Sequence, residues 1–509
     1  MSKIISFSKQ KQIDEINEIV NLMRITIGPR GKNVSLSNGD TVNDGRRIAD
    51  DAQPSKGAKK VQNLVRKIST DVGGGRTATA ILYQELIKVG MDLLNRGFNF
   101  NQLKKGMLLA VKDIHEQLDK MSVPVKNKLV EVATISTESE ELGKVIANTI
   151  KKVGVDSVVT VEESQAFGIT SEIADGLKFD KGYLSPYMIT DSVKLEAVYK
   201  DVPVLILDNK IGDFVQIKPL LDKLAKDGQK ELFIIAEDVD ESVLRFFAFL
   251  KFNGANKVLA IKTPGIGDNK KFCIEDLCAL TGAEVLTDLK SKEIKLGYLK
   301  KVVSKKDSTI LFSSADIKTW ITTLKTRSEL TENVWEKDQF KERIAKLQNG
   351  IAVIKVGASS EDEVKYLKLK IEDGVNETKR ALEGGIVMGG NVAFINAMKG
   401  LEPKSLPNEQ VMGYNIVIKA LQAPLRQIVL NGEGQPDVVM HVIMNSKSLT
   451  IGYNSLDNAI VEDMYASNII DATKVVKTVL EYAVNEAILL LSIGGDISEE
   501  LKDENTNRN

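Results

Sequence analysis

The sequence contains few of the side chains from which metal centres and disulfide frameworks are usually built: only two cysteines and two histidines in 509 residues. Cys273 and Cys278 fit neither a disulfide framework nor a Cys-x-x-Cys motif, so we expect a reducing compartment. His115 and His441 are too few for a zinc site made of histidines, and they make a Ser/His/Asp triad improbable. A single catalytic histidine remains open.

The sequence also lacks a strong charge of either sign and a long apolar run. Its formal net charge is −1, so no overall field attracts nucleic acid or an anionic membrane. No apolar run approaches the roughly 20 residues that span a bilayer, and one of the longest, residues 487–491, is typical of a core. Residues 1–5 begin neither a secretory signal nor a transit peptide. We therefore expect a cytoplasmic protein, with an organellar matrix as the alternative, and no nucleic-acid or membrane partner.

What is present is a chain whose middle differs from its ends. Residues 56–121 and the stretch that ends at Ile493 are mostly helical in pattern. Between them, β-branched runs alternate with helical patterns. The runs are 202–207, 232–236, 257–261 and 351–357, and two of the helical patterns are 217–226 and 241–252. This alternation predicts an α/β domain inserted into a largely helical chain, a mixed α and α/β fold.

The helical pattern at 241–252 is apolar around its whole circumference, with Arg245 and Lys251 as its only charges after Glu241. A helix packed on one sheet needs an apolar stripe of only about 100°. Either this helix is buried on both sides, or part of it is exposed to solvent and available for binding.

Three successive glycines, residues 73–75, precede a helical pattern at 79–87, with Thr77 or Thr79 placed to cap the helix. Glycines let a ligand approach the backbone closely, and a helix N-terminus offers unpaired N–H groups that suit phosphate. The pattern indicates a phosphate site, although an ordinary glycine turn remains the alternative.

Five segments taken together resemble the group I chaperonins, the bacterial GroEL type of the chaperonin-60 family. They are Ile25–Asn33, Phe179–Tyr187, Ile235–Val239, Pro264–Asp268 and Ala423–Asn431. The resemblance follows the chain in order from about Ile4 to Ile493. It implies a chaperonin fold: a mostly helical equatorial domain, a small intermediate domain and an α/β apical domain. The implied boundaries are 1–120 with 384–509 (equatorial), 121–174 with 352–383 (intermediate) and 175–351 (apical).

The resemblance also implies the assembly and its partners. Members of the family stack two rings of seven copies and enclose unfolded protein clients beneath a co-chaperonin lid. For this chain we expect a heptameric ring, either single, double or mixed with a paralogue. ATP binding and hydrolysis move the apical domains. In this chain the implied hinges are Pro124 with Gly385 and Gly176 with Gly350.

The implied cofactors are ATP and Mg²⁺. The nucleotide-binding residues carried over are Thr26, Ile27, Gly28, Pro29, Asn43, Gly45, Gly74, Gly75, Arg76, Thr77, Ala78, Gly389, Gly390, Asn454, Ser455 and Asp471. The catalytic residues carried over are Asp373 and Asp44. Asp373 corresponds to the carboxylate that positions the attacking water, and Asp44 lies in the second turn of the site. Phosphoryl transfer depends mainly on such positioning and on neutralising charge.

The phosphate loop departs from the family pattern. Gly74 replaces the aspartate that holds Mg²⁺, Arg76 and Ala78 replace threonines, and Asn43 replaces a lysine. A glycine side chain offers no oxygen to Mg²⁺, so no protein metal ligand is expected, and we expect a loss on the order of 10² to 10⁴ in hydrolysis rate. Arg76 either replaces part of the lost metal charge or is a solvated arginine on a turn.

The client-binding surface is carried over in the same way. It comprises Tyr183, Tyr187, Met188, Leu221, Leu244, Ala248, Phe249 and Leu250. Lys218 replaces a family leucine at one edge, and the C-terminal residues 499–509 are polar and expected to be disordered, where the family has a Gly/Met-rich tail.

Three functions follow from these observations. The first is an ATP-dependent chaperonin, an ATPase that assists folding inside a ring. The second is a degenerate chaperonin paralogue that binds clients or partners with little or no hydrolysis. The third, a metabolic α/β enzyme, finds no nucleophile–base pair and no Walker lysine in support.

Overall fold

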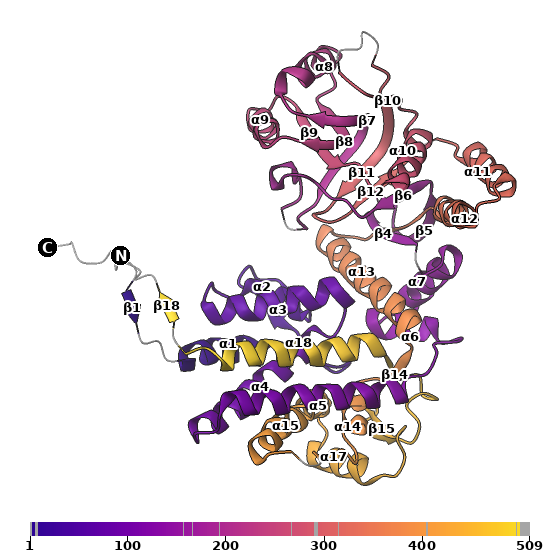
Figure 1. Ribbon diagram of the computed structural model, residues 1–509. Coiled ribbons are helices and arrows are strands. Elements are labelled where there is room, and N and C mark those ends of the chain that lie inside the picture. The colour runs from indigo at the N-terminus through magenta and orange to yellow at the C-terminus, as the bar shows by residue number, and fades with distance from the viewer. Residues whose placement is uncertain are drawn as a thin grey trace. The chain divides into compact units, whose positions relative to one another are not determined.

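The computed structural model describes residues 3–5, 9–155, 157–164, 166–192, 194–265, 267–289, 294–313, 315–403, 406–494 and 496–498. The predicted polar tail, residues 499–509, lies outside this part of the chain. Two compact units are present, Met1–Ile150 with Ala358–Asn509 and Lys151–Gly357 (Figure 1). The first unit therefore combines both ends of the chain, and the finer division into three domains remains a prediction.

The first unit is mostly helical. Its helices are α1 (Lys9–Arg24), α2 (Gly45–Asp51), α3 (Lys56–Val72), α4 (Arg76–Asn95), α5 (Phe100–Met121), α6 (Leu129–Thr137), α7 (Glu140–Val153), α13 (Glu361–Gly384), α14 (Val392–Ala397), α15 (Asn408–Ala420), α16 (Ala423–Asn431), α17 (Pro436–Asn445) and α18 (Thr473–Leu491). Helix α7 ends three residues into the second unit. Helix α18 packs along α4, and α15 packs along α5. The centre of α4 is fully buried because Ile81, Leu82 and Tyr83 all face core residues.

Short antiparallel strand pairs bring distant parts of the first unit together. They are β1 (Lys3–Ile5) with β18 (Asp496–Ser498), β2 (Val34–Ser35) with β3 (Thr41–Val42), β14 (Ile386–Met388) with β17 (Ile470–Ala472), and β15 (Gly452–Asn454) with β16 (Ala459–Val461). In the β14–β17 pair, Val387 lies opposite Asp471. This pairing places a predicted site residue of the C-terminal third beside the end of α13.

The second unit is built on a seven-stranded sheet of order β6-β12-β11-β7-β8-β9, with β10 also paired to β7. The strands are β6 (Gly176–Phe179), β7 (Ala197–Ile211), β8 (Glu231–Val239), β9 (Lys257–Lys262), β10 (Val285–Leu286), β11 (Gly297–Ser304) and β12 (Thr309–Phe312). The predicted runs 202–207, 232–236 and 257–261 lie in β7, β8 and β9, which are parallel. Continuous apolar runs suit parallel strands covered on both faces, so the α/β prediction is confirmed.

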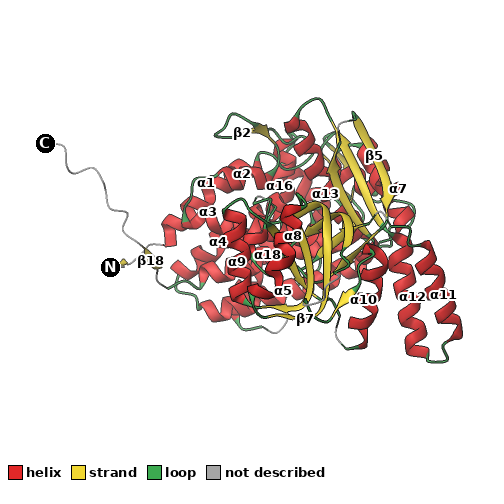
Figure 2. Cartoon of the chain, turned by 90° about the horizontal axis from the view of Figure 1, so that it is seen from above, coloured by secondary structure: helices red, strands yellow, loops and turns green. Residues whose placement is uncertain are grey.

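Helices α8 (Phe214–Lys226), α9 (Glu241–Phe252) and α10 (Asp268–Thr281) connect and follow these strands, and α11 (Lys318–Leu330) lies beside α12 (Val334–Asn349) (Figure 1 and Figure 2). A three-stranded sheet of order β4-β13-β5 completes the unit. Its strands are β4 (Val158–Glu163), β5 (Gly168–Ala174) and β13 (Ile351–Gly357). The strand predicted at 351–357 is therefore present. Among the helices described, none combines the length and apolarity needed to cross a bilayer.

Helix α9 is buried on one side only. Val243 and Phe247 are in the core, whereas Phe249 is 60% exposed and Phe252 is 75% exposed. Of the two possibilities left open by its all-round apolar pattern, the structure therefore shows the partly exposed one.

Candidate functional site

The glycine loop joins two long helices of the first unit. Helix α3 ends at Gly73, with φ of +87°, and α4 begins after Gly75, with φ of +78°. This left-handed backbone favours glycine, and a Cβ added to Gly75 would lie 2.3 Å from Cγ2 of Val479. The N-terminus of α4 is therefore reached by a backbone turn that other residues do not fit.

The predicted capping of this helix is wrong. Helix α4 starts at Arg76 rather than at residue 79, its N-cap is Gly75, and no side chain caps it. Thr79 instead lies inside the helix and donates its hydroxyl to the carbonyl of Gly75 at 2.8 Å. The first N–H groups of α4 are thus not taken by a side-chain cap, which is the arrangement that suits an anion.

Asp44 begins the short helix α2. Its side chain accepts a hydrogen bond from the backbone N–H of Arg47 at 2.9 Å, as an N-cap does. The next residue, Gly45, lies against the glycine-loop region, because a Cβ there would lie 2.6 Å from Oγ1 of Thr77. The second turn and the phosphate loop therefore meet, as the resemblance implied.

Arg76 connects these turns to α13. Its Nη2 lies 2.9 Å from Oδ2 of Asp44 and 2.7 Å from Oδ2 of Asp373. Its Nη1 donates to the carbonyl of Gly73 at 3.3 Å and contacts Oγ of Ser69 at 3.4 Å. Of the two alternatives for Arg76, the solvated arginine is wrong. Its exposed fraction is only 15%, because two carboxylates from distant segments hold it.

Burial and charge compete in this cluster. Burial lowers the pKa of Arg76, but the nearby charges of Asp373 and Asp44 raise it well above its ordinary value. Burial raises the pKa of Asp373, which the charge of Arg76 offsets only in part. Arg76 therefore remains a permanent cation, whose single positive charge offsets only part of the charge of the two carboxylates.

Sequence reasoning missed Glu377, one turn after Asp373 on the same face of α13. A Cβ added to Gly74 would lie only 1.3 Å from Oε1 of Glu377, so this carboxylate fills the space beside the glycine. Burial, together with the charges of Asp471 and Asp373, raises the pKa of Glu377 to about 7. In the sequence, the one signal for Glu377 was its position four residues after Asp373, which places both on the same face of a helix.

Gly389 and Gly390, two of the predicted nucleotide-binding residues, directly follow β14, which pairs with β17. Gly389 donates its N–H to the carbonyl of Ile469 at 2.8 Å, and a Cβ on Gly389 would lie 2.8 Å from the nitrogen of Ile470. Burial raises the pKa of Asp471 to about 6, although the backbone N–H groups of Asn391 and Gly390 lower it in part by hydrogen bonding. Gly389, Gly390 and Asp471 therefore form one local group.

The first predicted loop, residues 26–29, is held by Asn431. The amide of Asn431 donates to the carbonyl oxygens of Arg24 and Ile27 at 2.9 Å each, and of Ile25 at 3.1 Å. Gly28 has φ of +84°, and its added Cβ would lie 3.2 Å from Ile428.

Ser455 is buried beside Gly432, the residue that follows Asn431, and a Cβ added to Gly432 would lie 3.3 Å from the Cβ of Ser455. Asn454 donates to Asp457 at 2.6 Å. In the part of the chain described, neither Asn454 nor Ser455 has a hydrogen bond or ion pair to Arg76, so these residues flank the cluster rather than join it.

Two observations bear on whether ATP and Mg²⁺ fit this site. Within the described ranges, no three His, Cys, Asp or Glu side chains are grouped to hold a metal ion by themselves. Magnesium in nucleotide sites is usually held by one or two carboxylates together with the substrate phosphates, so a complete protein cage is not required. The carboxylate of Glu377 lies beside Gly74, so this part of the site contains an oxygen of the kind that Mg²⁺ prefers.

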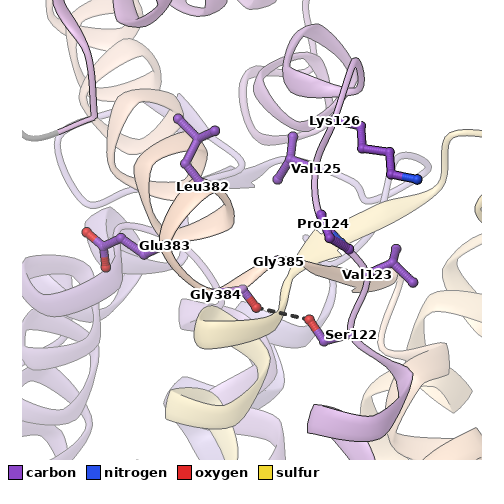
Figure 3. Close-up of a pocket in the computed structure, with 9 residues that line it drawn as sticks. All are labelled: Ser122, Val123, Pro124, Val125, Lys126, Leu382, Glu383, Gly384 and Gly385. Carbon is purple, nitrogen blue, oxygen red and sulfur yellow. Dashed lines mark hydrogen bonds between the residues drawn. The ribbon is translucent and has the colours of Figure 1, made fainter.

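A separate pocket lies where Ser122–Lys126 crosses Leu382–Gly385 (Figure 3). Ser122 donates its hydroxyl to the carbonyl of Gly384 at 2.9 Å, and Val123 and Ile386 exchange backbone hydrogen bonds of 3.0 and 2.8 Å. This is the crossing at which Pro124 and Gly385 are predicted to form a hinge. None of the predicted nucleotide residues lines it, so it is distinct from the ATP site.

The predicted client-binding residues all lie in the second unit, but they differ in exposure. Tyr187 and Phe249 are exposed, whereas Tyr183, Leu244 and Leu250 are half-buried. The remaining three, Met188, Leu221 and Ala248, are buried in this structure. The accessible part of the predicted surface is therefore aromatic and belongs to α9 and the 3-10 turn Pro186–Met188.

Aromatic contacts extend this surface to the start of α8. The rings of Phe214 and Phe246 are 3.5 Å apart between centroids, and Phe246 is 5.8 Å from Phe249. Tyr187 meets Phe252 edge-on at 6.0 Å. Lys251 ties the helix to the turn, because its ammonium donates to the carbonyls of Tyr187 and Ile189 at 2.9 and 2.5 Å.

The fold and the site can now be compared with known families. The model of the TCP-1/cpn60 chaperonin family matches residues 19–499, and the match therefore includes the glycine loop, Arg76, Asp373 and the exposed aromatic side of α9. The mixed α and α/β architecture agrees with a chaperonin fold. The chain belongs to the TCP-1/cpn60 chaperonin family, and its role is that of a chaperonin in protein folding.

Proposed function

We propose that this protein is an ATP-dependent chaperonin of the group I type, which binds non-native proteins and assists their folding inside a ring of its own copies. The observation that supports this proposal best is the meeting of three residues: the Nη2 of Arg76 lies 2.9 Å from Oδ2 of Asp44 and 2.7 Å from Oδ2 of Asp373. These three residues come from separate segments of the chain, and the resemblance assigns all three segments to one nucleotide pocket.

The pocket has the parts that phosphoryl transfer needs. The turn at residues 73–75 presents the N-terminus of α4, with its positive dipole end, to the phosphates. Asp373 would position the attacking water, and Asp44 would stabilise the facing turn. Mg²⁺, when bound with ATP, would neutralise the charge that develops on the phosphate oxygens. Asn454, Ser455 and Asp471 would lie around the base and ribose, and residues 26–29 would form the first loop of the site.

A second candidate function is a chaperonin that binds clients with little or no ATP hydrolysis. The ion pairs of Arg76 favour it, because Asp373 cannot orient water freely while a guanidinium 2.7 Å away holds its oxygen. In this case nucleotide would still bind, since Arg76 supplies a positive charge beside the phosphates.

Client binding would use the aromatic side of α9. Phe249 and Tyr187 offer exposed apolar contacts, and repetition of these contacts around a ring would add weak affinities through multivalency. A co-chaperonin lid would compete for the same surface. We place the protein in the cytoplasm, with an organellar matrix as the alternative.

One experiment compares wild type with Asp373→Asn for ATP binding, phosphate release and native mass with and without ATP. The main proposal expects a ring in both proteins, ATP binding in both, and phosphate release that is about 10² slower in the variant. Equal, slow release in both proteins would favour the second candidate. A wild-type protein that binds no nucleotide and forms no ring would contradict both.

A further inference from the structure

Two charges that the resemblance places in the nucleotide pocket are missing from their expected positions. Asn43 stands where the family has a lysine, and Gly74 stands where it has the aspartate that faces Mg²⁺. The structure shows one cation and one carboxylate in the same pocket on other residues, Arg76 and Glu377. The pocket therefore keeps the number of its charges although two positions have lost them.

Glu377 lies in the space of the missing aspartate. The Cβ that any side chain at residue 74 would carry falls 1.3 Å from Oε1 and 2.4 Å from Cδ of Glu377. An aspartate at residue 74 and the present glutamate would thus compete for one volume. The exchange moves a carboxylate from the loop to the facing helix without changing the part of the pocket it occupies.

The register of α13 against the loop fixes this placement. A Cβ on Gly73 would lie 2.6 Å from Cβ of Asn376, and Nε of Arg380 donates to the carbonyl of Asp71 at 3.1 Å. Residues 373, 376, 377 and 380 share one face of a helix, so this face is in contact with the loop over two turns. Glu377 points at the loop because its neighbours on both sides are anchored there.

Among the described residues, the carboxylate of Glu377 is not held in an ion pair in the way that Asp44 and Asp373 are. Asp44 and Asp373 are both engaged by Arg76, whereas in the described part of the chain Glu377 has no ion pair with a Lys, Arg or His side chain within 4.0 Å. Its side chain is partly exposed, although its carboxyl group is buried enough for burial to raise its pKa, and Ser136 is the one side chain that lowers this pKa by hydrogen bonding. A hard divalent cation prefers such carboxylate oxygens, shared with phosphate.

We propose that Glu377 replaces the lost loop aspartate and supplies the protein oxygen that faces Mg²⁺ when a nucleoside triphosphate is bound. The proposal deepens the proposed function and rests on it, since it needs a nucleotide in this pocket. It assigns a residue of α13 to a task that the resemblance assigns to the loop. Arg76 in turn supplies the cation that the second turn has lost.

The experiment measures, by titration calorimetry, the affinity of full-length protein for a non-hydrolysable ATP analogue in Mg²⁺ and in EDTA. For wild type we expect Mg²⁺ to strengthen binding by about tenfold or more, and for Glu377→Gln we expect this gain to fall to about twofold or less, with EDTA affinity retained. Glutamine keeps the volume of the side chain and removes its charge. Glu361→Gln, an exposed position at the start of α13, serves as the matched control and should keep the full gain.

Two results would overturn the proposal. An unchanged Mg²⁺ gain in Glu377→Gln would show that the carboxylate does not face the metal. Tighter binding of the variant both with and without Mg²⁺ would show that Glu377 obstructs the phosphate site instead. Absence of nucleotide binding by wild type is a different result, because it contradicts the proposed function itself and this proposal with it.

A second test returns the carboxylate from residue 377 to residue 74. We expect Gly74→Asp alone to unfold at a lower temperature than wild type, since its side chain would collide with Glu377. The double variant Gly74→Asp with Glu377→Ala should recover both the melting temperature and the Mg²⁺ gain, because alanine removes the colliding atoms and keeps the helix propensity of α13. Bound Mn²⁺, followed by its paramagnetic resonance in the presence of the analogue, gives a readout independent of affinity. A double variant that folds but shows no metal gain would contradict the exchange.

Discussion

The Nη2 of Arg76 lies 2.7 Å from Oδ2 of Asp373, the carboxylate to which the resemblance assigns hydrolysis. The same nitrogen lies 2.9 Å from Asp44 at the start of α2. One guanidinium therefore holds together the phosphate loop, the second turn and α13. An ion pair with little exposure costs desolvation, and removal of one partner leaves the others uncompensated.

Replacement of Arg76 by threonine should release Asp373 and speed hydrolysis. We expect phosphate release at saturating ATP to rise by about tenfold in Arg76→Thr, because a positioned carboxylate contributes a factor of this size or more. The same variant should lose about 3 kcal/mol of stability, because two carboxylates are left without their cation. A rate equal to or below that of wild type in folded protein would show that Arg76 does not restrain the site.

A matched control for this variant is Arg66→Thr on α3. Arg66 pairs with Asp50, but its side chain is 54% exposed. Exposed ion pairs contribute roughly 0 to 1 kcal/mol, so this variant should keep both the rate and the stability of wild type.

Asp471 should make stability depend on pH. Its pKa in the folded protein, about 6, exceeds the ordinary value of 3.8, so the folded state binds more protons between these values. The contribution of Asp471 to the free energy of unfolding should therefore fall by an amount on the order of 3 kcal/mol as pH rises from about 4 to 6. Above pH 6 this contribution should stay constant.

In Asp471→Asn the part of this fall that Asp471 causes should disappear, because the amide keeps an oxygen acceptor for Gly390 and Asn391 without a charge. The fall that Glu377 causes, through its own raised pKa, should remain in both proteins. Denaturant unfolding at pH 4, 5, 6 and 7 measures the effect, and Asp437→Asn, at an aspartate that is 89% exposed, is the control. Parallel pH profiles for wild type and Asp471→Asn would contradict the prediction.

The strands of the second unit could be predicted because their signal is local. Residues 202–207, 232–236 and 257–261 are continuous apolar runs, and such runs form buried parallel strands wherever helices cover both faces. Local patterns were less informative about exposure. Phe249 and Ala248 are neighbours in one apolar helix, yet the first is exposed and the second buried, since only the position of the sheet decides which side faces it.

The candidate site depended on contacts between distant residues. On the basis of sequence, Arg76 could be either a solvated arginine or a cation of the pocket. Its ion pair with Asp373, almost 300 residues away in the chain, distinguishes the two. Glu377 was missed for the same reason, because its carboxylate fills the space that a side chain at residue 74 would occupy, and only the structure shows this contact. The start of α4 was placed too late because Gly75 caps it through its backbone, without the side-chain signal that capping rules use.

The aromatic surface of α9 gives a prediction about clients. Phe249→Glu should abolish capture of an unfolded test protein, because it places a charge at the centre of the exposed aromatic contacts with Phe246. Light scattering of a denatured client diluted into the protein measures capture. Phe167→Glu, at a phenylalanine that is 80% exposed but outside the predicted surface, should leave capture intact. Equal capture by both variants would count against the assignment.

The glycine loop makes a prediction about packing that is independent of nucleotide. Gly75 and Gly97 both have positive φ, +78° and +89°, but a Cβ on Gly75 would lie 2.3 Å from Val479, whereas nothing lies within 4 Å of one on Gly97. Gly97→Ala should therefore cost only the backbone strain, about 1 kcal/mol, and Gly75→Ala should cost about 2 to 4 kcal/mol. Denaturant unfolding of both variants isolates the difference, which is the contact between the loop and α18. Equal losses of stability would mean that α18 yields easily at Val479, and that glycine is needed at residue 75 for its backbone conformation alone.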